Sequence, residues 1–249
     1  PGELMVGRDR LCKAHGNTPT RRCAAVIHVV RGGPDLSGSL SSSPRFPPVG
    51  DSLNHRLLLA RVRRTATLPG ITEDVFTRGL DVDYEEIHDH CTRVHEAVED
   101  ASVIRITTPQ QTDITLSTGD RAWRLDTGIV HAPGAMSNLP AGEVFVSPTT
   151  ADGTIEVTGT MAPHGLLDEG HSIVLAVEDG YVTEISDEAV SQQVETAAED
   201  VGRDAYNLAE LGIGTNVGIT SLVGSVLADE KAAGTVHFAI GDDAGIGGD

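Results

Sequence analysis

The chain has 249 residues, of which 39% are hydrophobic but only 3% aromatic, so it is long enough to bury a sizeable core of small aliphatic side chains. Its formal net charge of −19 disfavours nucleic acid and anionic membranes as partners, because phosphate binding needs clustered lysine and arginine. Only two of the 18 basic residues are lysines, and this scarcity together with the acidity suggests a salt-rich, halophilic source.

The first 64 residues differ from the rest in charge. They carry eleven basic and four acidic residues, a net charge of +7, whereas residues 65–249 carry seven basic and 33 acidic residues, a net charge of −26. The stretch GPDLSGSLSSSPRFPPVG in this segment is typical of loop or disorder. We expect a poorly ordered basic segment over 1–64 and a folded domain over 65–249. A polyanion-binding arm, an unstructured extension and a misread frame stay open for 1–64.

The cysteines and the hydropathy pattern bear on the cellular compartment. Cys12, Cys23 and Cys91 are odd in number and show no repeated spacing, which indicates neither a disulfide framework nor a zinc ribbon. No stretch approaches the roughly 18 apolar residues of a membrane span, and the N-terminus lacks a signal pattern. We therefore expect a cytoplasmic protein without a membrane partner.

Beyond residue 65 the pattern predicts a mixed α/β domain that is rich in strands. Asp83 and Glu86 form a capping box for a helix over 83–101. Alternating apolar residues that end at Pro or Gly predict strands in 102–109, 112–119, 143–148, 154–160, 171–185 and 235–242. Asp179 and Gly180 predict a hairpin turn. Residues 187–206 are close to helical spacing and predict a second long helix.

Several weaker candidate sites have simpler structural explanations. His88, Cys91 and His95 could face the same way on the first helix, yet Cys91 lies on its apolar stripe and no fourth zinc ligand is evident. His164 and His171 flank a turn that we expect to face solvent. The glycines of GIGTNVG lack the context of a dinucleotide fingerprint, and neither a GxSxG elbow nor a P-loop occurs.

Glu143, Glu210 and His237 each lie where a predicted element meets a glycine-rich turn. An unpaired carboxylate is expensive to bury at such a position, and a metal would relieve the cost. Two carboxylates and one histidine suit a hard or borderline divalent cation that activates water. Asp242 and Asp243, although close to His237, are better explained as turn residues.

Four segments resemble one enzyme family in their order along the chain. TLPGITEDVF, SNLPAGEVFVSP, AELGIGTN and DEKAAGTVHFAIGD are similar to the metal-dependent leucyl aminopeptidases that include aminopeptidases T and S. The resemblance covers roughly 65–249. It implies an α/β metallopeptidase domain with two divalent ions, zinc or cobalt and in some cases manganese. It also implies a peptide substrate, and a homodimer is a further partner that we consider.

The resemblance also implies roles for three residues. Glu210 and His237 would coordinate metal, and Glu143 would be a further ligand or the general base on a metal-bound water. The family places a tyrosine shortly after the histidine and a His-x-Asp ligand pair later, and this sequence contains neither. We therefore expect an incomplete ligand set, with a weak metal site or an inactive chain.

Two alternatives stay open beside the aminopeptidase. A related branch with the same motifs comprises iron-dependent ring-opening dioxygenases that act on dihydroxypyridines, and such an enzyme would use Fe(II) in place of zinc or cobalt. The other alternative is a non-catalytic fragment that binds little metal.

Overall fold

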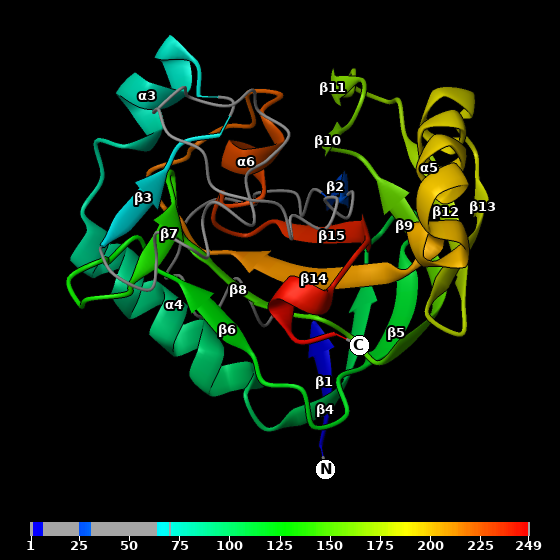
Figure 1. Cartoon of the computed structure of the whole chain (residues 1–249), viewed down its shortest axis with the longest axis horizontal. Helices are drawn as coiled ribbons and strands as arrows, with labels where there is room; N and C mark the ends of the chain where they lie inside the picture. Colours follow the sequence, from blue (N-terminus) through cyan, green and yellow to red (C-terminus); the bar gives the residue numbers. More distant parts are fainter. Residues whose placement is uncertain (1, 7–24, 31–63, 70, 249) are drawn as a thin grey trace, which may run out of the picture.

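The computed structural model describes residues 2–6, 25–30, 64–69 and 71–248, which form two large sheets and a short strand pair (Figure 1). The six-stranded sheet has, in spatial order, β1 (Gly2–Val6), β4 (Ala101–Thr107), β5 (Asp113–Ser117), β9 (Thr150–Val157), β12 (Ile173–Glu178) and β13 (Tyr181–Ile185). The seven-stranded sheet has β11 (Gly165–Leu166), β10 (Thr160–Met161), β2 (Ala25–Val30), β15 (Val236–Gly241), β14 (Leu208–Gly214), β8 (Glu143–Val146) and β6 (Arg124–Asp126). The pair is β3 (Thr65–Thr67) with β7 (Met136–Asn138).

Among the described residues, four helices and two 3₁₀ turns accompany the sheets (Figure 1). They are α3 (Glu73–Gly79), α4 (Tyr84–Val98), α5 (Glu188–Val201) and the short α6 (Val226–Asp229), with 3₁₀ turns η1 (Gly202–Tyr206) and η2 (Ala244–Ile246). The long helix α4 packs on β6 and β8, while α5 packs on β13 and η1. The expected mixed α/β, strand-rich fold is confirmed.

The main core joins the inner faces of both sheets. It contains Ile104 and Leu116 from the six-stranded sheet and Leu211 and Phe238 from the seven-stranded sheet. Most of its members are valine, isoleucine and leucine, as the scarcity of aromatic residues predicts. Alternation along β14 and β15 places these apolar side chains on one face and leaves the opposite face for other groups.

Several predicted elements are confirmed with close boundaries. Asp83 caps α4 by accepting hydrogen bonds from the backbone N–H groups of Glu85 and Glu86, at 3.0 and 3.3 Å. The hairpin between β12 and β13 turns at Asp179 and Gly180, where φ is +51° and +82°, as a tight primed turn requires.

One prediction needed correction, and one strand that carries a candidate ligand was missed. The second long helix is α-helical only to Val201, because Gly202 adopts φ +65° and the chain continues as the 3₁₀ turn η1. Strand β14 was not predicted at all, since its glycines weaken the strand signal.

The segment 1–64 contributes β1, which pairs in parallel with β4, and β2, which pairs in parallel with β15. The expectation of irregular structure for the remainder of 1–63 falls outside the described residues, as do Cys12 and Cys23. Within the described ranges, no helix is both long and apolar enough to cross a membrane.

Candidate metal centre

Three neighbouring strands place the three candidate ligands on one face of the seven-stranded sheet. The antiparallel register sets Glu143 of β8 opposite Gly214 of β14, and His237 of β15 opposite Gly212. Directly opposed residues of an antiparallel pair point to the same face, and residues two apart along a strand do too. Glu210, two residues before Gly212, therefore shares the face with Glu143 and His237.

The side chains of these residues converge. Nε2 of His237 lies 3.2 Å from Oε2 of Glu143 and 3.1 Å from Oε1 of Glu210. One potential ligand atom from each residue lies within 4.8 Å of the other two, and no other such group of three occurs in the described part of the chain. His237 is fully buried, Glu143 is 5% exposed and Glu210 is half-buried. The structure thus brings together all three residues that the sequence indicated.

Glycine is required at two positions of this centre. A Cβ atom on Gly212 would lie 2.0 Å from Nε2 of His237, so any larger residue would displace the imidazole. Gly142, directly before Glu143, has φ +120°, and its Cβ would lie 2.8 Å from the Cβ of Asn216. Gly142 of SNLPAGEVFVSP and Gly212 of AELGIGTN are therefore explained by the backbone conformation and the space that the ligand side chains need.

A buried lysine completes the cluster. The side chain of Lys231 is only 2% exposed, and its Nζ lies 2.5 Å from Oε1 of Glu143 and 2.7 Å from Oε1 of Glu230. The sequence reasoning did not single out this residue. A signal was present, because Lys231 is one of only two lysines in a strongly acidic chain.

The charges of the cluster shift the pKa values of its members. Burial raises the pKa of Glu143, but the Lys231 ammonium and a hydrogen bond with His237 outweigh it and hold that pKa below its usual range. Burial alone would lower the pKa of His237, yet its contacts with Glu143 and Glu210 raise that pKa to about 10. Without a metal, both glutamate contacts therefore favour a protonated imidazole.

Asp126 is a second residue that the sequence reasoning missed. It lies opposite Glu143 in the β6–β8 register, and its Oδ1 accepts a 2.6 Å hydrogen bond from Oγ of Ser137. Burial, opposed in part by the positive charge of Lys231, raises the pKa of Asp126 to about 6. No motif marks this aspartate, so only the strand register reveals its position.

The weaker candidates do not form a metal site. His88 is exposed, and Cys91 is buried, with Sγ 3.0 Å from Oγ1 of Thr215. Burial raises the pKa of the Cys91 thiol to about 11, which disfavours a reactive thiolate. His164 lies near solvent, and its Nε2 is 2.9 Å from Oδ1 of Asp187.

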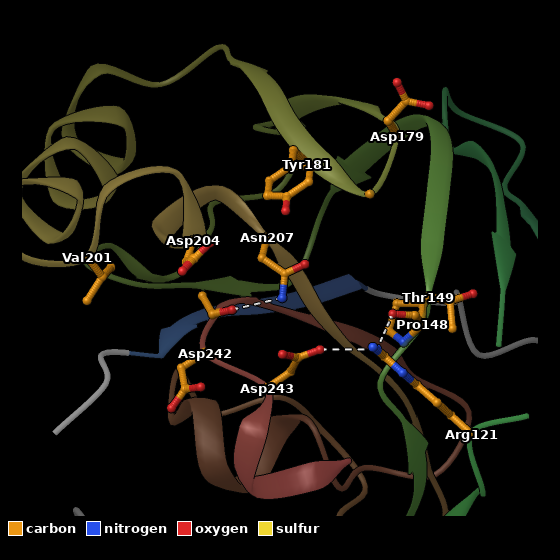
Figure 2. A pocket seen from close by; sticks show the side chains of 12 residues that line it. Arg121, Pro148, Thr149, Asp179, Tyr181, Val201, Asp204, Asn207, Asp242 and Asp243 are labelled. Carbon is orange, nitrogen blue, oxygen red and sulfur yellow. Dashed lines mark hydrogen bonds and ion pairs between the residues drawn. The ribbon is translucent and has the colours of Figure 1, made fainter. Parts of the chain in front are cut away.

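The aspartates after β15 belong to a different region. Oδ2 of Asp243 accepts a hydrogen bond from Nη1 of Arg121 at 3.2 Å (Figure 2) and another from Oγ of Ser147 at 2.5 Å. Asp242 accepts a bond from the backbone N–H of Ala244, which makes it a turn residue. Both line a pocket of about 330 Å³ (Figure 2). This pocket lies beyond the C-terminal ends of β8 and β15, whereas Glu143 and His237 lie near the N-terminal ends of these strands.

The donor set fits a divalent cation. Two carboxylates and an imidazole are ligands of hard or borderline metals such as iron, manganese, cobalt and zinc. Nδ1 of His237 is buried and has no hydrogen-bond partner among the described residues. Because Nε2 is the nitrogen that faces both glutamates, a cation held with them would bind Nε2, and the N–H at Nδ1 would still need an acceptor such as a water.

Comparison with known proteins finds a matching family model and similar solved structures. The family model described as NicX, 2,5-dihydroxypyridine 5,6-dioxygenase, matches residues 75–242. Among solved structures, 2,5-dihydroxypyridine dioxygenase from Pseudomonas putida KT2440 is similar, with a TM-score of 0.60 and 20% identity over 75% of this chain and 57% of that chain. Wild-type AmpT from Thermus thermophilus has a TM-score of 0.45 and 21% identity over 70% of this chain and 47% of that chain. No curated protein matches.

At 20% identity the similarity to the dioxygenase structure bears on the fold alone. This chain spans only 57% of the length of the dioxygenase structure, which is less than two thirds. The segment matched by the family model contains Glu143, Glu210 and His237, as well as Lys231 and Asp126.

Proposed function

Because the chain belongs to the NicX family of 2,5-dihydroxypyridine 5,6-dioxygenases, we propose that it is an Fe(II)-dependent dioxygenase that opens the ring of a dihydroxypyridine. The family match over 75–242 is the observation that carries this proposal. The four motifs had led us to expect an aminopeptidase, with this dioxygenase as the alternative. Family membership supports the alternative better.

In this proposal Glu143, Glu210 and His237 bind the metal. Their ligand atoms already lie within 4.8 Å of one another, so little rearrangement is needed to hold one cation. Iron held there would supply the redox chemistry through which O₂ reacts with the ring. The protein contributes fixed ligands on three adjacent strands and a buried setting that excludes bulk water.

The role of Glu143 differs between the two activities. In an aminopeptidase it would accept a proton from the attacking water, whereas in a dioxygenase it would serve as a metal ligand. Its Oε1 is held by Lys231, and only Oε2 faces His237. This arrangement supports the role of a ligand that offers one oxygen atom.

One experiment separates the activities. The full chain, stripped of metal and reloaded anaerobically with Fe(II), should consume O₂ when 2,5-dihydroxypyridine is added, and loss of the ring absorbance should accompany the uptake. The same chain loaded with Zn(II) or Co(II) should not cleave a leucyl anilide. Leucyl anilide cleavage without Fe(II)-dependent O₂ uptake would overturn the proposal.

The non-catalytic alternative is tested by metal content. We expect the purified chain to bind close to one divalent ion or more, and Glu210→Ala to reduce that content severalfold. A chain that binds far less than one ion, with no change in Glu210→Ala, would instead be a fragment without a metal centre.

A further inference from the structure

Lys231 is unusual because a lysine is almost never fully buried unless it is paired. It lies between α6 and β15, and its side chain is 2% exposed. Both backbone polar groups of Lys231 are hydrogen-bonded. Its N–H donates to the carbonyl of Ala228 at 3.2 Å, and its carbonyl accepts from the N–H of Asn216 at 2.8 Å. The ammonium therefore projects from a rigid loop.

Asn216 also fixes the strand that carries Glu143. Its side-chain Nδ2 donates a 2.7 Å hydrogen bond to the carbonyl of Ala141, two residues before Glu143. The same asparagine thus connects the backbone of Lys231 with the segment that precedes Glu143. This double connection sets the distance between the lysine and the glutamate independently of their side-chain contact.

The two oxygen atoms of Glu143 face different partners. Oε1 lies 2.5 Å from Nζ of Lys231, and Oε2 lies 3.2 Å from Nε2 of His237. With one oxygen held by the ammonium, the carboxylate cannot rotate freely about its last bond. The other oxygen is consequently kept on the side where Glu210 and His237 converge.

The charges of the cluster also require a fixed cation. Glu143, Glu210 and Glu230 contribute three negative charges around one buried region, and Lys231 contributes one positive charge. One divalent cation, with His237 neutral as a ligand, would offset most of this excess of negative charge, to which Asp126 adds when it is ionised. Without the ammonium, two of the three carboxylates would lose their nearest positive partner, and their mutual repulsion would spread the cluster.

We propose that Lys231 is a positioning residue of the metal centre, whose ammonium anchors Oε1 of Glu143 so that Oε2 is presented to the metal. The anchor is present before any metal binds, so the site is preorganised. The inference rests on the proposed function only in that the cluster is taken to bind a divalent cation.

The test uses Co(II) alone as the probe, with the full chain first stripped of metal. Lys231→Met keeps most of the length of the side chain and removes its charge. We expect Co(II) affinity, measured by titration calorimetry, to fall by about tenfold or more, as is typical when a residue that orients a ligand is lost. The visible absorption spectrum of bound Co(II) should also change, because Glu143 no longer offers one fixed oxygen.

Arg121→Met is the matched control, because it removes a largely buried cation at the opposite ends of the same strands (Figure 2). It should lower the melting temperature but leave Co(II) affinity and the Co(II) spectrum at wild-type values. If folded Lys231→Met binds Co(II) with wild-type affinity and spectrum, the proposal is overturned. If that variant does not fold, Lys231→Gln, which retains a hydrogen-bond donor, is judged by the same two measurements.

A wild-type chain that binds no Co(II) would count against the proposed metal centre and would leave the anchor to be tested separately. Thermal unfolding of the metal-free Lys231→Met, Glu143→Gln and double variants then decides. A direct anchor predicts that the double variant loses less melting temperature than the sum of the single losses, by several degrees, since about 1 kcal/mol of coupling corresponds to about 2–4 °C in a chain of this size. Additive losses would overturn the proposal.

Discussion

Strands β8 and β15 run in the same direction and carry a buried polar cluster at each end. At their starts lie Glu143 and His237, which contact each other, and Lys231 contacts Glu143. Just beyond their other ends lie Ser147 and Asp243. The two clusters share strands, sheet and core, so they differ in their chemistry rather than in their surroundings.

The difference lies in how the charges are balanced. Beyond the ends of the strands, Arg121 pairs with Asp243, and Ser147 donates a hydrogen bond to the same carboxylate oxygen. At the starts, three glutamates meet one lysine and one histidine. Apolar or fully paired side chains would stabilise a fold at least as well as such an excess of carboxylates. The balanced cluster therefore serves the fold, whereas the unbalanced one is suited to a ligand cation.

The largest effect should come from removing the histidine. His237→Ala deletes one ligand of three, and we expect the affinity for Co(II) to fall by more than about 100-fold, beyond the loss typical of a residue that only orients a ligand. Titration calorimetry of the metal-free variant measures this, with circular dichroism to verify folding. If a folded His237→Ala chain binds Co(II) almost as tightly as wild type, the cluster at the starts of the strands is not the metal site.

A change in backbone space should have the next largest effect. Gly212→Ala places a methyl group 2.0 Å from Nε2 of His237, so the ring must move. We expect Co(II) affinity to fall about tenfold and the free energy of unfolding to fall by about 1–3 kcal/mol. Urea unfolding and calorimetry measure the two quantities. As a control, Gly79→Ala, whose Cβ would lie 3.3 Å from Pro140, should leave Co(II) affinity unchanged.

At the balanced cluster, a substitution should affect stability alone. Asp243→Asn leaves the Arg121 guanidinium without its carboxylate partner, and we expect the free energy of unfolding to fall by about 1–3 kcal/mol. Urea unfolding of the metal-free chain measures it. Co(II) affinity should stay within about threefold of wild type, because the mutated cluster lies beyond the far ends of the strands. A larger loss of affinity would show that the two ends are not independent.

The smallest effect is expected at an ionic contact away from both clusters. Asp187 caps α5, and a hydrogen bond with His164 followed by one from the backbone of Val190 holds the pKa of Asp187 below its usual range. A lowered carboxyl pKa stabilises the fold above about pH 4 and loses this contribution as the pH falls further. Asp187→Ala should cost about 1 kcal/mol at pH 7.

The pH dependence of that cost is its check. Urea unfolding of wild type and Asp187→Ala, followed from pH 7 to pH 3, should show the difference shrinking below about pH 4. A difference that stays constant with pH would mean that the ionised cap contributes nothing. Asp187→Ala should leave the Co(II) affinity unchanged, because Asp187 lies away from both buried clusters.

Much of the fold follows from local patterns. Alternation predicted β4, β5, β12 and β13, and the turn at Asp179–Gly180 followed from backbone preference. Strand β14 was missed because Gly212 and Gly214 carry no side chain to report alternation. The strand register explains the sequence of β14. Leu211 and Ile213 face the core, whereas Gly212 lies opposite His237 and Gly214 opposite Glu143.

The candidate site was predictable only in part. Glu143, Glu210 and His237 were found through their motifs, although nothing in their spacing fixes a distance between them. Lys231 and Asp126 were missed, because their proximity to Glu143 arises from a loop and a strand pairing that are distant in sequence. Composition did mark Lys231 as rare, but rarity does not identify a partner.

The burial of Lys231 gives this protein a chemical reporter. An amine-directed acylating reagent needs access to a free Nζ, and the folded chain covers that atom almost completely. Lys231 should therefore be protected from acylation in the native state and become labelled only when the segment between α6 and β15 opens. Because the chain has just one other lysine, mass spectrometry can assign the label without ambiguity. The rate of labelling then measures how often this loop opens in solution.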